Sequence, residues 1–113
     1  MVDTYVPQSG DILDISFNPQ TGHEQGGRRP ALVVSSALYY QKTNMLIVCP
    51  ITNTVKGFPL HLKLPQGLRT TGVIMCEQVR SLDYKQRQAS FVERAPVDIL
   101  RQAREIVALC MED

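Results

Sequence analysis

A polar loop broken by glycines leads straight into an apolar run in the stretch Gly22-His23-Glu24-Gln25-Gly26-Gly27-Arg28-Arg29-Pro30-Ala31-Leu32-Val33-Val34-Ser35. The glycines let the backbone adopt positive φ angles and let a ligand approach closely, while Pro30 biases Arg29 toward an extended conformation. The loop gathers an imidazole, a carboxylate, an amide and two guanidinium groups. A strand that presents such a loop predicts a functional site; the alternative is a hydrophilic hairpin connection with solvated charges.

Strand patterns flank this stretch on both sides. Upstream, Leu13, Ile15 and Phe17 alternate with polar residues, which predicts a half-buried strand that ends at 18–19. The connection from 18 to 30 is long for a hairpin, and connections of this length are usually functional or mobile. Downstream, short apolar or alternating runs are separated by Gly, Pro or charged turns. They lie at 31–35, 45–51, 58–64, 73–76, 79–82 and 89–92. This set predicts a small barrel.

The period changes near the C-terminus. From Pro96 onward, apolar residues recur at Leu100, Ala103, Val107 and Cys110, which predicts a helix that runs nearly to the end and caps an open end of the barrel. A short helical turn is predicted at 38–40. His61 falls on the polar, outward side of the 58–64 run, so we expect it at the surface.

Composition bounds the class of protein. The 113 residues, 43% apolar and 20% charged, predict one globular domain over 1–113. No apolar run approaches a membrane span and no charged leader opens the chain, so a cytoplasmic protein is expected. Cys49, Cys76 and Cys110 are widely spaced and odd in number, which argues against a disulfide framework or a structural zinc site. We expect all three to be small core residues.

Charge is unevenly distributed along the chain. Residues 28–94 carry ten Lys and Arg against three acidic residues, a local balance of +7, while the rest of the chain carries −6. A segregated basic centre can attract a polyanion although the net charge is only +1. The pattern favours RNA as a partner.

Three blocks carry a family resemblance. The first is Gly-His-Glu-Gln at 22–25, a spacer, Arg29-Pro30 and an apolar strand. The second is Val48-Cys49-Pro50-Ile51-Thr52, and the third is the acidic-Gln-x-basic-[Ser/Thr]-x-Asp pattern at 77–83. Together, in this order, they resemble the MazF/PemK family of toxin endoribonucleases over nearly the whole chain.

The resemblance implies a fold, an activity and partners. The fold is a mainly β (α+β), SH3-like small barrel of the MazF/CcdB type with a C-terminal helix, paired as a homodimer. The activity is that of a type II toxin–antitoxin toxin, a sequence-specific endoribonuclease that acts on single-stranded RNA, with an acidic, partly disordered MazE-like antitoxin as inhibitor. Such a segment would fold on binding a basic surface.

RNA can be cut without a metal because its 2′-OH lies beside its own phosphate. The enzyme must move protons and stabilise the phosphorane, which general acid–base groups and fixed positive charge do, and the products are a 2′,3′-cyclic phosphate and a 5′-OH. We therefore expect no cofactor and no metal. Asp11 and Asp14 are separated by three positions in a strand, which puts them on opposite faces and disfavours a two-metal site.

The first loop supplies the predicted catalytic groups. Arg29, which matches the family's arginine before the proline, is assigned to phosphate stabilisation, with a surface pair to Glu24 as the alternative. Glu24 is assigned the acid/base role and His23 a second one, since imidazole titrates near neutrality. Neighbouring residues in an extended loop point to opposite sides, so His23 binding only a loop carbonyl remains the alternative. Arg28 is assigned a general electrostatic contact.

Thr52 ends an apolar strand and matches the family's site threonine, so its hydroxyl is predicted to donate to a phosphate oxygen. The alternative is that it caps the turn at Asn53. Gln78 is expected to read a base edge or hold a loop, and Glu77 to pair with Arg29. The acidic position is more often Asp in the family, and Met75 stands where some relatives are basic, so a catalytic role for Glu77 stays open.

Further polar side chains are predicted to contact RNA, although each alone is commonly a solvated surface group. The predicted RNA-binding set is Gln25, Arg28, Asn53, Lys56, Glu77, Gln78, Arg80, Lys85 and Arg87. Phe58, Tyr39 and Tyr84 are candidates for stacking on unpaired bases, with a core position as the alternative.

Two other functions remain open on sequence grounds. A CcdB-like barrel that binds DNA gyrase would share the fold without catalysis. An RNA-binding module with impaired catalysis would bind RNA and leave it intact. The combination of Glu24, Arg29 and Thr52 favours the nuclease, because a pure binder does not need these groups together. The recognised RNA sequence does not follow from one chain.

Overall fold

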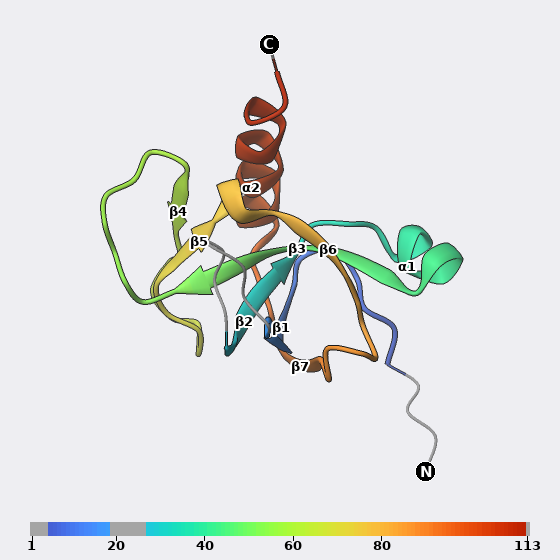
Figure 1. Cartoon of the computed structure of the whole chain (residues 1–113). Helices are drawn as coiled ribbons and strands as arrows, with labels where there is room; N and C mark the ends of the chain where they lie inside the picture. Colours follow the sequence, from blue (N-terminus) through green and yellow to red (C-terminus); the bar gives the residue numbers. More distant parts are fainter. Residues whose placement is uncertain (1–4, 19–26, 113) are drawn as a thin grey trace.

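The structure is a computed structural model that describes residues 5–18 and 27–112. Figure 1 shows the elements, with α2 lying across one side of the strands and α1 projecting at another. Their order is β1 (Asp11–Ser16), β2 (Arg28–Val33), α1 (Ala37–Thr43), β3 (Met45–Thr52), β4 (His61–Lys63), β5 (Val73–Met75), the 3₁₀ turn η1 (Cys76–Gln78), β6 (Arg80–Asp83), β7 (Ser90–Arg94) and α2 (Val97–Leu109).

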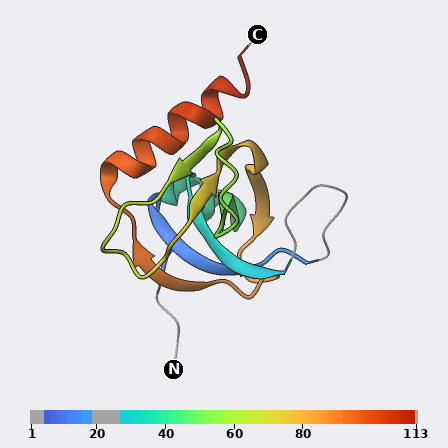
Figure 2. The same cartoon turned by 90° about the vertical axis from the view of Figure 1, so that its left-hand side faces the viewer.

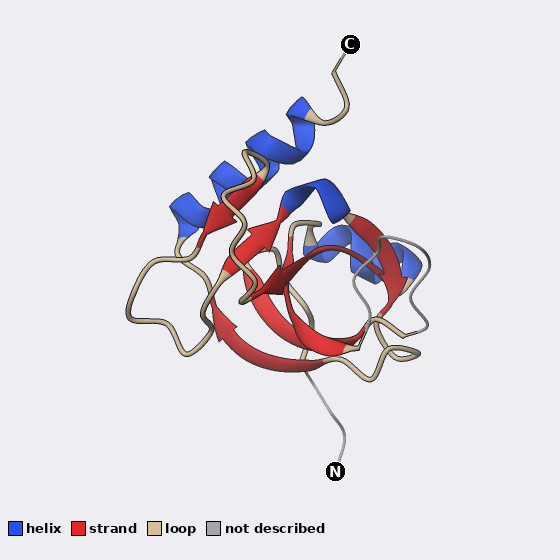
Figure 3. Ribbon diagram, turned by 60° about the vertical axis from the view of Figure 1, so that its left-hand side comes forward, coloured by secondary structure: helices blue, strands red, loops and turns tan. Residues whose placement is uncertain are grey.

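The strands form one antiparallel network centred on β3. Neighbours follow the order β4-β5-β3-β2-β1-β7, and β6 also pairs with β3. One edge of β3 pairs with β2; along the other edge, Met45–Val48 pairs with β6, and Ile51 and Thr52 pair with β5. The strands curl around a common axis (Figure 3), so the predicted small barrel with a C-terminal helix is confirmed.

Both faces of the curved sheet are buried. Leu13 and Ile15 of β1 pack in one apolar cluster with Ala31 and Val33 of β2. The alternate residues, such as Ile12 and Leu32, pack in a second cluster against α2. This two-sided burial explains why β2 reads as a continuous apolar run and not as an alternation.

α2 follows the predicted period but covers a different part of the barrel. Ile99, Ala103 and Val107 are its buried residues, and they pack against the second cluster. The helix therefore lies along the side of the barrel (Figure 2), and the expectation that it closes an open end is wrong. Outward apolar side chains of β1–β3 require this cover. Cys110 is exposed, which corrects its predicted core position, while Cys49 and Cys76 are buried.

The other predicted elements differ mainly in their bounds. The helical turn at 38–40 is confirmed as part of α1, which begins after an N-cap at Ser36 and ends at Asn44 with φ of 60°. The predicted 58–64 strand contains only β4, because residues before it form a turn and Pro59 removes a backbone donor. Among the described residues, no helix is long and apolar enough to cross a membrane.

Candidate active site

Arg29 and Thr52 converge where β2 begins and β3 ends. The β2–β3 register pairs Ala31 with Pro50, and Arg29 and Thr52 each lie two residues beyond this pair, on the same side of their strands. Residues opposite each other in an antiparallel pair share a face. The Arg29 Nη1 lies 3.5 Å from the Ile51 carbonyl oxygen, so the guanidinium reaches the end of β3. The structure thus brings together two of the predicted catalytic residues.

Arg28 points away from this place. It belongs to β2, and neighbours in a strand face opposite sides. Its Nε donates to Asp14 Oδ2 at 2.8 Å, and its Nη2 donates to the Gln88 carbonyl at 2.8 Å. Arg28 is therefore held on the face opposite Arg29, and its general electrostatic contact with RNA stays a prediction.

Thr52 has a turn-capping contact as well as a position at the site. Its side chain is nearly buried, and its Oγ1 accepts a hydrogen bond from the Thr54 backbone N–H at 3.1 Å. Gly72 lies directly against it: a Cβ at Gly72, which has φ of 110°, would come within 2.2 Å of the Thr52 carbonyl oxygen. Asn53 accepts from Thr71 Oγ1 at 2.8 Å and lines a different groove.

A pocket of about 380 Å³ opens beside Thr52. It collects residues from the end of β3, the 53–60 segment, β4, β5 and η1. The lining residues are Thr52, Thr54, Lys56, Phe58, His61, Met75, Glu77 and Gln78. Three members of the predicted RNA-binding set, Lys56, Glu77 and Gln78, therefore lie together.

His61 is the residue that sequence reasoning misplaced. Its side chain is only 9% exposed, and its Nε2 lies 3.1 Å from Glu77 Oε2. The Phe58 ring packs edge-on against the imidazole at 5.2 Å between centroids. Its expected surface position is wrong because η1 folds over this side of β4. The partner of Glu77 in the structure is thus His61, where the sequence suggested Arg29.

Arg80 adds a second cation on the face that carries Arg29 and Thr52. It pairs with Val48 in the β3–β6 register, four residues from Thr52 and so on the same side of β3. Its guanidinium lies 5.7 Å from the centroid of the Phe17 ring. The Arg80 Nη1 is buried without a hydrogen-bond partner. Phe17 itself is fully buried, so Arg80 lies between this ring and the outside of the barrel.

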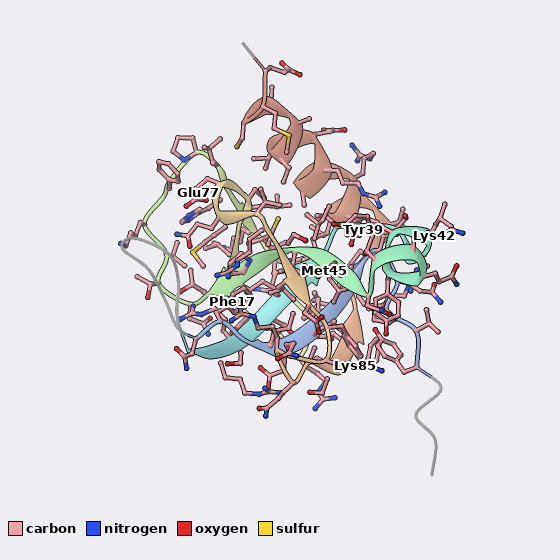
Figure 4. All side chains as sticks on the ribbon, turned by 45° about the vertical axis from the view of Figure 1, so that its right-hand side comes forward. Phe17, Tyr39, Lys42, Met45, Glu77 and Lys85 are labelled. Atoms are coloured by element: carbon pink, nitrogen blue, oxygen red, sulfur yellow. The ribbon has the colours of Figure 1, made fainter. Side chains whose placement is uncertain are left out.

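Other predicted contacts lie elsewhere. Arg87 Nη1 donates to the Asn18 carbonyl at 2.6 Å, and Lys85 lies across the molecule from Glu77 (Figure 4), so neither lines the pocket. Tyr84 is buried in the core, and the Tyr39 hydroxyl lies 3.3 Å from Ser81 Oγ. Among the three stacking candidates, only Phe58 lines the pocket.

Part of the predicted site lies outside the described residues. His23, Glu24 and Gln25 belong to the stretch between 18 and 27, and so does the alternative pair of Arg29 with Glu24. Asp11 accepts from the Tyr5 hydroxyl and from Arg94 Nη1 at 3.0 Å, while Asp14 pairs with Arg28, so the two aspartates have different partners. Within residues 5–18 and 27–112, no three His, Cys, Asp or Glu side chains are grouped for a metal ion.

Comparisons with known proteins agree with this fold. The model of PemK-like, MazF-like toxins of type II toxin–antitoxin systems matches residues 8–111. The endoribonuclease toxin MazF of Escherichia coli strain K12 is 40% identical over 90 residues, which are 80% of each chain. The chain therefore belongs to the PemK-like, MazF-like toxins of type II toxin–antitoxin systems, and it is an endoribonuclease toxin.

Solved structures give the same answer for the fold. MazF from Deinococcus radiodurans matches with a TM-score of 0.91 at 42% identity, covering 95% of this chain and 97% of that one. A MazE–MazF complex from the same organism matches with a TM-score of 0.82 at 36% identity, covering 95% and 96%. The mainly β fold with a C-terminal helix is therefore that of MazF.

Proposed function

We propose that this toxin cuts single-stranded RNA at a short recognised sequence, without a metal ion, by attack of the ribose 2′-OH on the adjacent phosphate. The products are a 2′,3′-cyclic phosphate and a 5′-OH. The observation that carries the proposal is the convergence of Arg29 with Thr52 at the ends of two paired strands. Guanidinium and hydroxyl donors held at one place suit the nonbridging oxygens of a phosphate that gains charge in the transition state.

The roles divide between charge and proton transfer. Arg29 stabilises the phosphorane, and Thr52 donates to one of its oxygens. Glu24 acts as acid or base, with His23 as a second proton carrier, and general acid–base catalysis of this kind contributes about 10²–10⁴-fold. Thr52 Oγ1 accepts a hydrogen bond from the Thr54 N–H, so the Thr52 O–H remains available to donate to the substrate.

We propose that the RNA path follows Arg29, Thr52 and Arg80, which share one face of the sheet, and then the pocket beside Thr52. Arg80 supplies a further positive charge beside Phe17, and the pocket with Lys56, Phe58 and Gln78 continues it. Aromatic stacking and phosphate contacts are the usual means of holding unpaired RNA. Lys85 and Arg87 would serve only a longer track, because they lie away from the pocket.

The proposed partners are a second copy of this chain and an acidic MazE-like antitoxin, with action in the cytoplasm on mRNA and the 113 residues acting as one domain. The MazE–MazF complex from Deinococcus radiodurans supports the antitoxin. A disordered acidic segment that folds on a basic surface would compete with RNA for the same charges.

The test is incubation of the purified, antitoxin-free protein with a long unstructured RNA in excess EDTA, followed by mapping of fragment ends. Cuts at a recurrent short sequence with cyclic-phosphate and 5′-hydroxyl ends are expected. Binding without cleavage would favour the impaired RNA-binding module. If the folded protein neither binds nor cleaves RNA, DNA gyrase becomes the candidate target and is assayed directly.

A further inference from the structure

The pocket beside Thr52 contains two buried polar atoms that the protein leaves without partners. They are His61 Nδ1 and Glu77 Oε1, and they belong to two side chains that already hydrogen-bond each other. Leaving a buried donor or acceptor unsatisfied costs about 1–3 kcal/mol, and native proteins rarely keep such atoms without a reason. Both side chains line the same pocket, so a ligand that enters it lies next to these two unmet hydrogen-bonding groups.

The His61–Glu77 contact determines whether Glu77 Oε1 donates or accepts a hydrogen bond. Because His61 Nε2 faces a carboxylate oxygen, it must carry the proton and donate to Glu77 Oε2. This contact holds the carboxylate in place and leaves Oε1 as a pure acceptor. A ligand that satisfies the pocket must therefore bring an N–H or O–H donor to Glu77 Oε1.

The rest of the pocket suits a flat, aromatic ligand. The Phe58 side chain is 44% exposed while its edge packs on His61, so part of the ring remains open. The volume of about 380 Å³ is at the small end of the range for ligand sites. Stacking of a base on an aromatic side chain contributes about 1–3 kcal/mol and works for any base, so the selection must come from the polar edge.

The pocket lies within reach of the proposed cleavage site. Thr52 lines the pocket and also ends β3, next to the Ile51 carbonyl that the Arg29 guanidinium reaches. Figure 4 shows Glu77 on the same side of the barrel as the β3 end, above Phe17. A nucleotide next to the cleaved bond can therefore place its base against His61 and Glu77 while its phosphate meets Arg29.

Resting on the RNA cleavage proposed above, we propose that Glu77 is a specificity-determining residue that His61 positions, and that the pocket selects a base with an exocyclic amino group. Adenine, cytosine and guanine each carry such a group, and it can donate to Glu77 Oε1. Uracil carries carbonyl oxygens on both sides of its one ring N–H, and they would face the carboxylate. Lys56 in the same lining offsets the negative charge that Glu77 would present to RNA.

The test compares substrates that differ by one amino group. Oligonucleotides with the preferred sequence are made with inosine for guanosine, purine riboside for adenosine, or pyrimidin-2-one riboside for cytidine, one position at a time. Values of kcat/KM are measured for the wild type, Glu77→Gln and Glu105→Gln. Glu105 lies exposed on α2 and does not line the pocket, so its replacement removes the same charge outside the pocket. Dissociation constants are measured in parallel with a 2′-deoxy nucleotide at the cleaved position, which prevents cutting.

At one position, deletion of the amino group is expected to cost the wild type and Glu105→Gln about tenfold or more, and Glu77→Gln clearly less. His61→Phe is expected to weaken the same preference, and to add nothing when Glu77 is already Gln, because it acts through the carboxylate. Equal losses in the wild type and Glu77→Gln at every position would overturn the proposal while leaving the nuclease intact. An absence of both binding and cleavage by the wild type would overturn the proposed function as well.

Discussion

At the scale of single residues, the site depends on which side of a strand each cation faces. Arg28 and Arg29 are adjacent and chemically identical, yet one is held by Asp14 and the other reaches the end of β3. The period of a strand makes this difference, since alternate side chains face opposite sides. Substitutions at the two positions should therefore have very different effects.

Arg29→Ala is expected to lower the rate of RNA cleavage by about 10²-fold or more, because it removes a donor to the transition-state phosphate. Arg29→Lys should recover part of the loss, since lysine restores the charge but not the paired donors. Arg28→Ala, the matched control, should reduce cleavage much less and act mainly on stability through Asp14 and Gln88. Single-turnover rates with circular dichroism check this; an Arg29→Ala protein that is folded and cuts at the wild-type rate removes Arg29 from the mechanism.

Gly72→Ala is expected to destabilise the protein by about 2 kcal/mol or more, from backbone strain together with a collision. The added Cβ would meet the Thr52 carbonyl at 2.2 Å, so cleavage should fall as Thr52 shifts. Gly67→Ala is the control, because Gly67 also has positive φ, of 100°, but has open space around it. Urea unfolding and cleavage rates separate the two effects, and equal behaviour of both variants would contradict the collision.

At the scale of elements, β7 anchors the segment that leads into β5. The Glu93 carboxylate accepts from the backbone N–H groups of Arg69 at 3.0 Å and Thr70 at 2.7 Å, and from Thr70 Oγ1 at 2.7 Å. Although desolvation works in the opposite direction, these hydrogen bonds from Thr70 and Arg69 lower the pKa of Glu93 below its ordinary value. Glu93 thus fixes the approach of Gly72 to Thr52 from outside the site.

Glu93→Gln is expected to lower the melting temperature at pH 7 and to have little effect near pH 3. A carboxyl whose pKa is lowered by folding contributes stability above its unfolded pKa of about 4.3, and loses that contribution as the pH falls through the folded value. Glu105→Gln, which removes an exposed carboxylate of α2, should show a much smaller change. Melting curves at both pH values provide the measurement. The same wild-type-to-variant difference at pH 7 and pH 3 would contradict the role of ionised Glu93.

At the scale of the whole molecule, sequence patterns predicted what depends on local order. The alternation at 13–17 and the period after Pro96 marked β1 and α2, and the Arg-Pro and Ile-Thr patterns marked the residues that the β2–β3 register brings together. The sequence could not show that α2 lies on the side of the barrel, because a helical period reveals which face is buried and not what covers it.

The His61–Glu77 pair shows where sequence reasoning fails. The two residues are 16 apart, and only the pairing of β4 with β5, followed by the turn of η1, brings them into contact. No period or spacing encodes such a contact. The sequence predicts that Arg80 contacts RNA, but it does not show that Arg80 lies over Phe17. That position depends on the β3–β6 register. The unmet hydrogen bonds of the pocket also depend on side-chain positions that only the folded chain defines.

The different partners at the two edges of β3 have a consequence for how such a toxin evolves. Its β2 edge presents the Arg29–Thr52 pair, while its opposite edge supports β5 and, through it, the pocket of His61 and Glu77. On the roles proposed here, the choice of message and its cleavage depend on different side chains, which lie on elements either side of β3. A lineage can therefore redirect its toxin to other transcripts through a few replacements around β4 and η1, while the cutting machinery stays untouched.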